Sequence, residues 1–248
     1  MASKPKSEAK PIDPRAKIVD ALMELAAEQR FEDISIRDIC KRAEVSLADF
    51  RDCFPSKGAV LAGLSRRIDR AVLSQDTDEL SDESPRERLF DILMRRLEAM
   101  APYKEGLREA TAWLRREPTA ALAMNQVVMT SMRFMIEAAG LELDGGGAAV
   151  LKLQGLTLAW SRVLNVWLDD DDPGLSKTMA ELDRELTRGE RAVGAVDRAA
   201  DFAWPIRALA QAVFDARRRR RERPHRARKA EGERRGGDET SAGDASLA

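Results

Sequence analysis

The sequence FEDISIRDICKRAEVSLADFRDCFPSK, residues 31–57, determines how the rest of this chain is organised. Ser35 stands directly before apolar residues at helical spacing and is followed three residues later by Asp38, and Ser46 and Asp49 repeat the arrangement. A Ser hydroxyl and an acidic side chain at this spacing can cap the start of a helix reciprocally. The stretch therefore predicts two short helices joined by a very short turn.

The length of this turn predicts a helix-turn-helix. Only residues 43–45 lie between the two helices, and so short a connection makes them cross steeply instead of running antiparallel. The second helix of such a pair can enter the major groove of DNA. Pro55 is expected to end this helix, and Ser56 is expected to cap a long third helix with Lys57 in its first turn.

This segment resembles the DNA-binding segment of the tetracycline-repressor (TetR) family of bacterial regulators. The resemblance rests on ISIRDICKRAEVSLADF followed by FPSK, which combines an Ile-Arg-Asp-Ile opening, an Ala-x-Val-Ser turn and the aromatic Phe54 in one register. It implies an all-α homodimer with an N-terminal helix-turn-helix domain of three helices and a C-terminal helical-bundle domain for ligand binding and dimerisation. It also implies double-stranded DNA and a small effector as partners.

The chain departs from the family's pattern in the turn and on the second helix. The family usually has Gly where Glu44 stands, and Glu lacks the ready access of Gly to left-handed backbone angles. Asp49 and Asp52 lie on the predicted reading helix and oppose the attraction of phosphates, which supplies most non-specific affinity for DNA. We therefore predict DNA binding that is weakened by local charge.

The first residues of the reading helix are predicted to approach base edges. Leu47 and Ala48 can contact a thymine methyl group, and Asp49 can accept a hydrogen bond from cytosine. Arg51 and Lys57 are better placed for phosphates. The full set predicted to take part in DNA binding is Arg15, Ser35, Arg37, Ser46, Leu47, Ala48, Asp49, Arg51 and Lys57.

Composition adds no general preference for nucleic acid. The 248 residues include 42 basic and 43 acidic side chains, and the pI of 6.1 lies below the range that by itself indicates nucleic-acid binding. Cys40 and Cys53 form no disulfide framework, and the chain begins with no apolar leader, which together favour a cytoplasmic protein. Because it has no nucleophile–base pair, metal-ligand spacing or cofactor motif, we expect no enzymatic activity, metal or cofactor.

Composition and periodicity divide the chain into four parts. Residues 1–12 are predicted to be a disordered arm, and residues 13–75 the helix-turn-helix domain. An acidic, polar break follows at residues 74–85. Residues 84–215 are predicted to form the ligand-binding and dimerisation domain, and residues 216–248 a disordered basic tail.

Two long segments of the second domain are strongly apolar. Residues 119–139 are apolar nearly all round, which predicts a helix buried on most sides, and residues 148–168 form a second such helix. Their methionines suit a plastic pocket for a small apolar effector, while ordinary core or a dimer interface is the alternative explanation. Two such helices also favour pairing with a second copy. The predicted ligand-binding residues are Met94, Trp113, Met124, Val128, Met132, Met135 and Trp160.

Four consecutive aspartates, residues 169–172, lack the spacing of a calcium loop and do not converge on one ion. They predict a solvated helix break that supplies an N-cap for a helix beginning after Pro173. That helix is expected to end near Gly189.

A second resemblance covers the C-terminal domain. APYKEGL, residues 101–107, and WLDDDDPGLSKTMAELDREL, residues 167–186, resemble the ubiquinone-biosynthesis lipid-binding accessory family. This resemblance implies the alternative function of an accessory protein that binds isoprenoid lipid and uses a TetR-like scaffold without binding DNA. Residues 199–221 combine an apolar face with terminal arginines, which predicts either contact with an anionic membrane surface or docking on the domain core.

Overall fold

A computed structural model of the chain describes residues 13–75, 82–143 and 146–194. These residues form α-helices, short 3-10 turns and loops, without a strand in the described ranges, which confirms the predicted all-α class. They belong to one compact unit that extends to Val193. The arm at residues 1–12, the segment at residues 199–221 predicted to contact a membrane surface or to dock on the core, and the basic tail lie outside the described residues.

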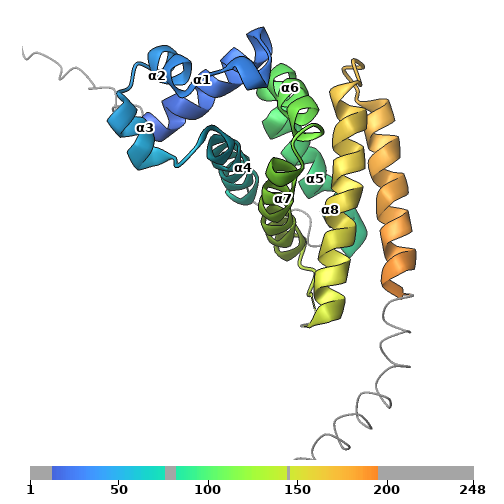
Figure 1. Cartoon of the computed structure of the whole chain (residues 1–248). Helices are drawn as coiled ribbons and strands as arrows, with labels where there is room; N and C mark the ends of the chain where they lie inside the picture. Colours follow the sequence, from blue (N-terminus) through green and yellow to red (C-terminus); the bar gives the residue numbers. More distant parts are fainter. Residues whose placement is uncertain (1–12, 76–81, 144–145, 195–248) are drawn as a thin grey trace, which may run out of the picture. The chain divides into compact units, whose positions relative to one another are not determined.

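The N-terminal helices are arranged as the sequence predicts (Figure 1). Asp13 accepts the N–H of Arg15 and Pro14 occupies the first turn of α1. Ser56 caps α4 by accepting the N–H of Ala59. The elements in order are α1 (Pro14–Glu28), the 3-10 turn η1 (Phe31–Asp33), α2 (Ile36–Ala43), α3 (Leu47–Cys53) and α4 (Lys57–Leu73).

Both predicted capping boxes are confirmed. The Ser35 Oγ accepts the N–H of Asp38 at 3.2 Å, and the carboxylate of Asp38 accepts the Ser35 N–H at 2.9 Å. Ser46 and Asp49 make the same two bonds, each at 3.0 Å. The hydrogen bonds from Ser35 and Ser46 hold the pKa values of the two Asp carboxyls below their usual range. These caps fix where α2 and α3 begin.

The reading helix α3 ends at Cys53, so the prediction that it extends through Phe54 is wrong. Phe54 has extended backbone angles, because Pro55 disfavours the helical conformation of the residue before it. Its buried ring instead lies against α4, where a Cβ atom added to Gly63 would come within 2.7 Å of it. Only glycine at position 63 therefore lets α4 pack this closely behind the helix-turn-helix.

The C-terminal helices begin after Ser84, which caps the first of them by accepting the N–H of Glu87. The 3-10 turn over Pro102 leads directly into the next helix. The sequence misplaced one boundary, because the last described helix, residues 176–194, continues past the predicted end near Gly189. One interior glycine weakens a helix without ending it. The remaining elements are α5 (Pro85–Met100), η3 (Ala101–Tyr103), α6 (Lys104–Leu114), α7 (Pro118–Ala138) and α8 (Gly147–Leu168).

Helix α7 is much less buried than its sequence predicts. Its only fully buried residues, Ser131, Met132, Met135 and Ile136, lie in its C-terminal half. Leu122, in the other half, is 70% exposed. The prediction of a helix buried on most sides is therefore wrong for the described chain, because the first half of α7 is left without full cover by its neighbours.

The acidic segment before the last helix is only partly solvated. Asp172 accepts the N–H of Ser176 and so provides the predicted cap. Asp170, in contrast, is buried and accepts the N–H and the hydroxyl of Thr178 at 2.9 and 2.7 Å. The expectation of a fully solvated break is wrong at Asp170, because its partners are on the buried side of the next helix. No metal-binding cluster of His, Cys, Asp or Glu occurs among the described residues.

Glu44 ends α2 in the left-handed region, at φ 54° and ψ 46°. A residue with a Cβ atom is strained there, whereas glycine is not. We expect Glu44→Gly to raise the free energy of unfolding by about 0.5–1 kcal/mol in urea titrations. Glu44→Ala is the matched control, since it removes the charge but keeps the Cβ atom. An equal gain in both variants would show that charge, and not backbone strain, is responsible.

Candidate nucleic-acid interface

The reading helix α3 has one buried anchor and a broad exposed face. Phe50 is buried in the core, whereas Leu47 is 51% exposed and Ala48, Asp49 and Arg51 are exposed beside it. Because α3 is short and follows a capped turn, its orientation is set by the packing of Phe50 and by the cap. The structure thus brings four of the predicted DNA-binding residues together on one surface.

The charged side chains of α3 differ in whether they have a hydrogen-bond partner. The Oδ2 atom of Asp49 accepts both the backbone N–H and the hydroxyl of Ser46, at 3.0 and 2.7 Å. Arg51 and Asp52 make no hydrogen bond or ion pair with any described residue. Asp49 is therefore held in the cap, while Arg51 and Asp52 present opposite, unpaired charges to the solvent.

Four further predicted residues lie on or beside the helix-turn-helix. The hydroxyls of Ser35 and Ser46 are engaged in their capping boxes, so their contribution to the site is to position the helices. Arg37, in the first turn of α2, is exposed and is joined to no other described residue. Arg15 lies at the start of α1, with its guanidinium carbon 4.7 Å from the centre of the Phe54 ring. This contact places a positive charge beside the end of α3.

Lys57 has a different environment from the other predicted cations. Its ammonium group donates to the carbonyl oxygens of Phe31, Glu32 and Ile34, at 2.5, 3.4 and 2.8 Å. It also lies 4.7 Å from the centre of the Phe31 ring. Burial lowers the pKa of Lys57, with Glu32 opposing this effect. These contacts favour a structural role for Lys57 over the predicted phosphate contact.

The sequence analysis missed the residues that tie the helix-turn-helix to the second domain. The Phe31 N–H donates to the carboxylate of Glu109 on α6 at 3.1 Å, and the Phe31 ring stacks on Trp113 with the ring centres 4.5 Å apart. Phe31 and Glu109 are 78 residues apart in the chain, so no local pattern connects them. Trp113, predicted to contact a ligand, therefore packs against the turn that precedes α2.

Helix α6 also packs closely on α1. A Cβ atom added to Gly106 would lie 2.5 Å from the backbone oxygen of Met23, so the two helices approach at a distance that only glycine permits. Nearby, Arg67 of α4 pairs with Asp20 of α1, and its guanidinium also donates to the Tyr103 hydroxyl at 2.9 Å. The acidic break thus separates two parts of the chain that share one packed core, and the predicted domain boundary stays a prediction.

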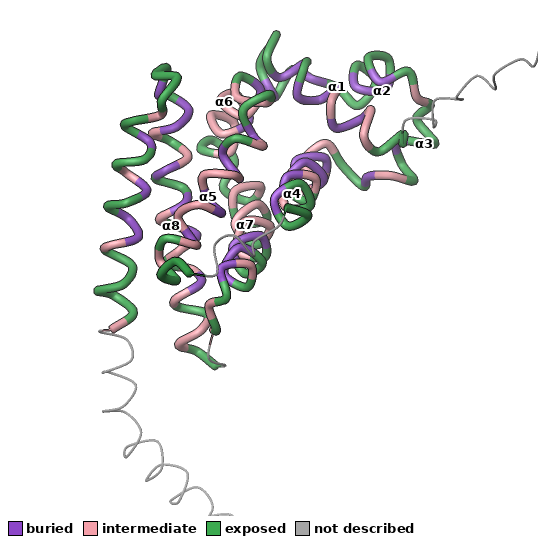
Figure 2. Tube along the Cα trace, turned by 180° about the vertical axis from the view of Figure 1, so that it is seen from behind, coloured by how far each residue is buried: buried purple, intermediate pink, exposed green. Residues whose placement is uncertain are grey.

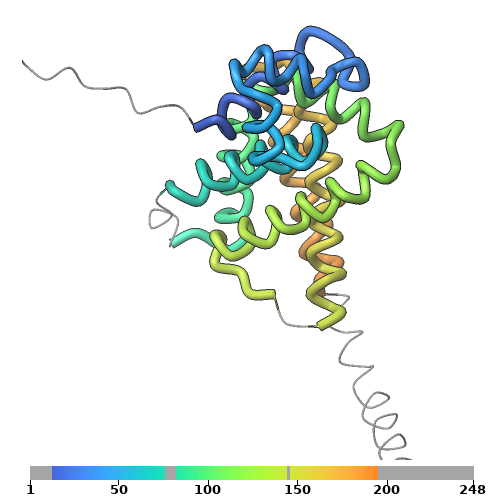
Figure 3. Tube along the Cα trace, turned by 60° about the vertical axis from the view of Figure 1, so that its left-hand side comes forward, coloured from blue at the N-terminus to red at the C-terminus, as the bar shows by residue number. Residues whose placement is uncertain are grey.

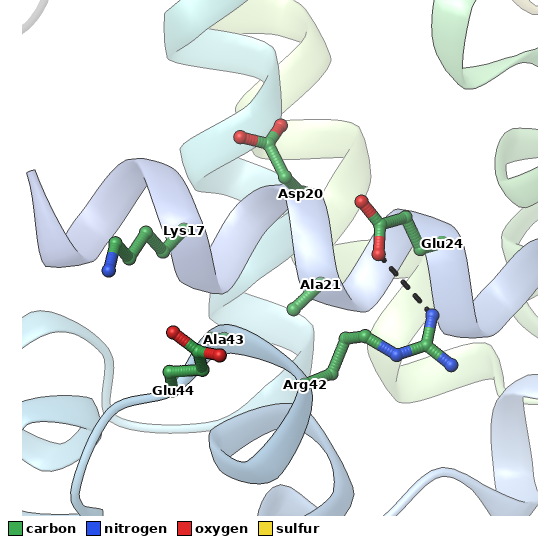
Figure 4. Close-up of a pocket in the computed structure, with 7 residues that line it drawn as sticks. All are labelled: Lys17, Asp20, Ala21, Glu24, Arg42, Ala43 and Glu44. Carbon is green, nitrogen blue, oxygen red and sulfur yellow. Dashed lines mark hydrogen bonds and ion pairs between the residues drawn. The ribbon is translucent and has the colours of Figure 1, made fainter. Parts of the chain in front are cut away.

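A shallow pocket of about 240 Å³ lies between α1 and α2 (Figure 4). Arg42 extends along it and pairs with Glu24 at 3.3 Å and with Glu28 at 2.7 Å. Charges of both signs line the pocket, so it favours neither an anion nor a cation. Its lining residues are Lys17, Asp20, Ala21, Glu24, Arg42, Ala43 and Glu44.

The predicted ligand-binding residues are distributed between the core and its margin. Met132, Met135 and Trp160 are buried, whereas Met94, Met124 and Val128 are partly buried and pack against the core. A second pocket, of about 620 Å³, lies elsewhere, between Phe90 of α5 and Met179 of the last described helix. None of the predicted ligand residues lines either of these two pockets.

Helices α7 and α8 leave a set of large apolar side chains in solvent. Leu151 and Leu158 lie two turns apart on α8 and are 58% and 50% exposed. Figure 2 shows exposed positions along α8 and the last described helix. These two helices run side by side in Figure 1, and in Figure 3 the last described helix lies behind α8. The exposed large apolar residues of α7 and α8 are Leu122, Phe134, Val150, Leu151 and Leu158.

Comparisons with solved structures identify the fold. A TetR transcriptional regulator from Nitrosomonas europaea superimposes with a TM-score of 0.58 at 24% identity, covering 71% of this chain and 97% of the other. One from Rhodococcus sp. RHA1 gives 0.50 at 20% identity, covering 71% and 95%. No family model matches the sequence, and no curated protein matches it.

The chain therefore has the fold of these TetR-type regulators. Among the described residues, none of the helices combines the length and apolar content needed to cross a membrane.

The contacts of Lys57 predict that replacing this residue lowers the stability of the fold. Because Lys57→Met leaves buried carbonyl groups without a donor, we expect the free energy of unfolding to fall by about 1–3 kcal/mol in urea titrations. Arg51→Ala, at an exposed site, is the control and should change it by less than about 0.5 kcal/mol. If Lys57→Met left the free energy of unfolding unchanged, the predicted phosphate contact of Lys57 would be favoured over a structural role.

Proposed function

We propose that this protein is a dimeric, TetR-type transcriptional regulator that binds operator DNA through α3. The observation that carries the proposal is the capped helix-turn-helix, which presents Leu47, Ala48 and Arg51 on one exposed face. A face of this size suits insertion of α3 into the major groove. The fold shared with solved TetR regulators supports the same function.

Within this surface we assign separate roles to the exposed residues. Leu47 and Ala48 contact base edges, where apolar side chains can recognise a thymine methyl group. Arg51, Arg37 and Arg15 contact phosphates, because each guanidinium is exposed near the helix-turn-helix. Asp52 opposes these contacts. Asp49 retains its second carboxylate oxygen for a base, while its first oxygen holds the cap.

We further propose that a small, largely apolar ligand controls DNA binding and that the protein acts as a repressor. The packing of Trp113 and Glu109 on Phe31 supports such control, because it connects α6 to the turn before α2. A ligand that shifts α6 therefore changes the position of the helix-turn-helix. Met124, Val128, Met132 and Met135 of α7 remain the proposed lining of the ligand site, together with Met94 and Trp160.

A homodimer is the third part of the proposal. The apolar residues that α7 and α8 leave in solvent, among them Leu151 and Leu158, are suited to a second copy of the same surface. A two-fold dimer places two α3 helices on successive major grooves, about 34 Å apart along DNA.

The lipid-binding alternative rests on the second resemblance. Its two sequence segments meet in the structure, where the Lys104 ammonium donates to the carbonyl oxygen of Asp170 at 2.6 Å and lies over the Trp167 ring. This contact stabilises the fold in either function. The segment predicted to contact a membrane, residues 199–221, lies outside the described residues, so DNA footprinting decides between the two functions.

DNA binding is tested by footprinting the purified protein on the DNA upstream of its own gene, at several salt concentrations. Arg51→Ala should weaken binding to all sequences and reduce the slope of log K against log salt by about one, because one phosphate contact is lost. Asp52→Asn should strengthen binding, because it removes a charge that repels phosphate.

The control for these variants is Arg133→Ala, which removes an exposed arginine from α7, away from the helix-turn-helix. If Arg51→Ala and Asp52→Asn both bind DNA as the wild type and the control do, the assignment of α3 to the major groove is wrong. If no footprint appears at low salt even with Asp52→Asn, the lipid-binding function takes its place.

The dimer is tested by sedimentation at micromolar concentration. The wild type should sediment as a dimer, and Leu151→Glu combined with Leu158→Glu should give a folded monomer, because charges at an apolar interface lose their solvation. Leu73→Glu, at another exposed apolar residue, is the control and should leave the dimer intact. A dimer that tolerates both charges on α8 would place the interface elsewhere.

A further inference from the structure

A buried ion pair lies where four helices of the unit meet. Arg96 of α5 is 3% exposed and pairs with Asp69 of α4. The hydroxyl of Ser131 on α7 donates to the same carboxylate at 2.6 Å, and the Arg96 guanidinium lies 5.4 Å from the centre of the Trp160 ring on α8. The proposed DNA contacts use none of these four residues.

The hydrogen bonds of Arg96 are incomplete. A guanidinium has five N–H donors arranged in a planar fork. The Nε atom of Arg96 is buried and has no hydrogen-bond partner, and the bond from its Nη2 atom to the Ser65 hydroxyl is long, at 3.3 Å. A buried donor without a partner is unfavourable, so one edge of this guanidinium is open to an acceptor that the described chain does not supply.

Helix α7, which contributes Ser131 to this cluster, combines buried methionines with a loosely packed first half. Ser131 is followed by Met132 and, one turn later, by Met135, and both methionines are fully buried. The first half of α7, residues 118–130, contains no buried residue. Flexible methionines and a weakly held helix are the features that allow a buried site to open around an apolar group.

We propose that Arg96 is the anchor of the effector site and binds the carboxylate of an amphiphilic ligand whose apolar tail lies among the methionines of α7. A carboxylate matches the planar fork of a guanidinium through two parallel hydrogen bonds. A single negative charge suits the one open edge, whereas a doubly charged phosphate loses more solvation on entering an apolar site. For the effect of the bound ligand on DNA binding, this inference rests on the proposed function.

The consequence follows from the place of Asp69. A carboxylate bound at the open edge brings a second negative charge to Arg96 and so weakens the pair that its Nη1 atom makes with Asp69, whose other partner is Ser131. Helix α4, which carries Asp69, begins at Lys57, directly behind the helix-turn-helix. Weakening this ion pair therefore loosens the packing of α5 on α4. If DNA binds the state in which the pair is intact, then bound DNA must lower the affinity for the carboxylate, because the two effects are reciprocal.

The experiment measures binding of hexanoate, decanoate and tetradecanoate to the full chain by calorimetry, with the primary alcohols of the same lengths as uncharged controls. The wild type should bind at least one carboxylate about tenfold or more tightly than its alcohol. Asp69→Asn should increase this preference, because it removes the competing charge.

The double variant Arg96→Met with Asp69→Asn removes both buried charges, and so avoids leaving either one unpaired. It should bind carboxylate and alcohol alike. The assignment of Arg96 as the anchor is wrong if no carboxylate of the series binds better than its alcohol. It is also wrong if Asp69→Asn leaves the preference for carboxylate unchanged, which is the result expected if the Arg96–Asp69 pair has only a structural role. Should the double variant fail to fold, the Asp69→Asn result alone decides.

Footprinting of the same proteins separates this inference from the proposed function. A carboxylate preference that depends on Asp69, in a protein that gives no footprint, supports the anchor and refutes the DNA-binding function. A footprint in a protein without any carboxylate preference supports the DNA-binding function and refutes the anchor.

Discussion

The ammonium group of Lys57 binds three carbonyl oxygens of the segment before α2, and the position of the helix-turn-helix depends on this contact. The same segment is held from the other side by α6, through the bond from Phe31 to Glu109 and the stacking of Phe31 on Trp113. The first turn of α4 and the side of α6 thus enclose Phe31. A movement of α6 reaches the DNA-binding helices through one aromatic residue, without a long flexible connection.

The proposed DNA surface combines attraction and repulsion in a few residues. Arg51 and Asp52 are neighbours on α3 and have no partner among the described residues, so both charges act fully on an approaching phosphate. Asp49 is partly withdrawn because it caps its own helix. We therefore expect low non-specific affinity and a proposed recognition that depends more on how Leu47 and Ala48 fit the bases.

Helices α5, α7 and α8 contain both an apolar surface without cover and a polar group without a complete set of partners. Leu151 and Leu158 remain exposed although α8 contributes Trp160 and Trp167 to the core. Arg96 is buried although its Nε has no acceptor. Each feature is unfavourable in an isolated chain, because apolar side chains in water and unpaired buried donors both cost free energy. A second copy and an anionic ligand are the partners that would satisfy them.

The sequence by itself determined the features that depend on residues close together in the chain. The capping boxes, the start of α1 and the start of α5 all follow from side chains that bond within one helical turn. The prediction for α7 was wrong because the burial of an apolar helix depends on the number of its neighbours, which its own sequence does not contain. Only the tertiary structure showed that Lys57 donates to three carbonyl oxygens, that Trp113 stacks on Phe31 and that Arg96 meets Asp69, because these contacts join residues brought together by helix packing.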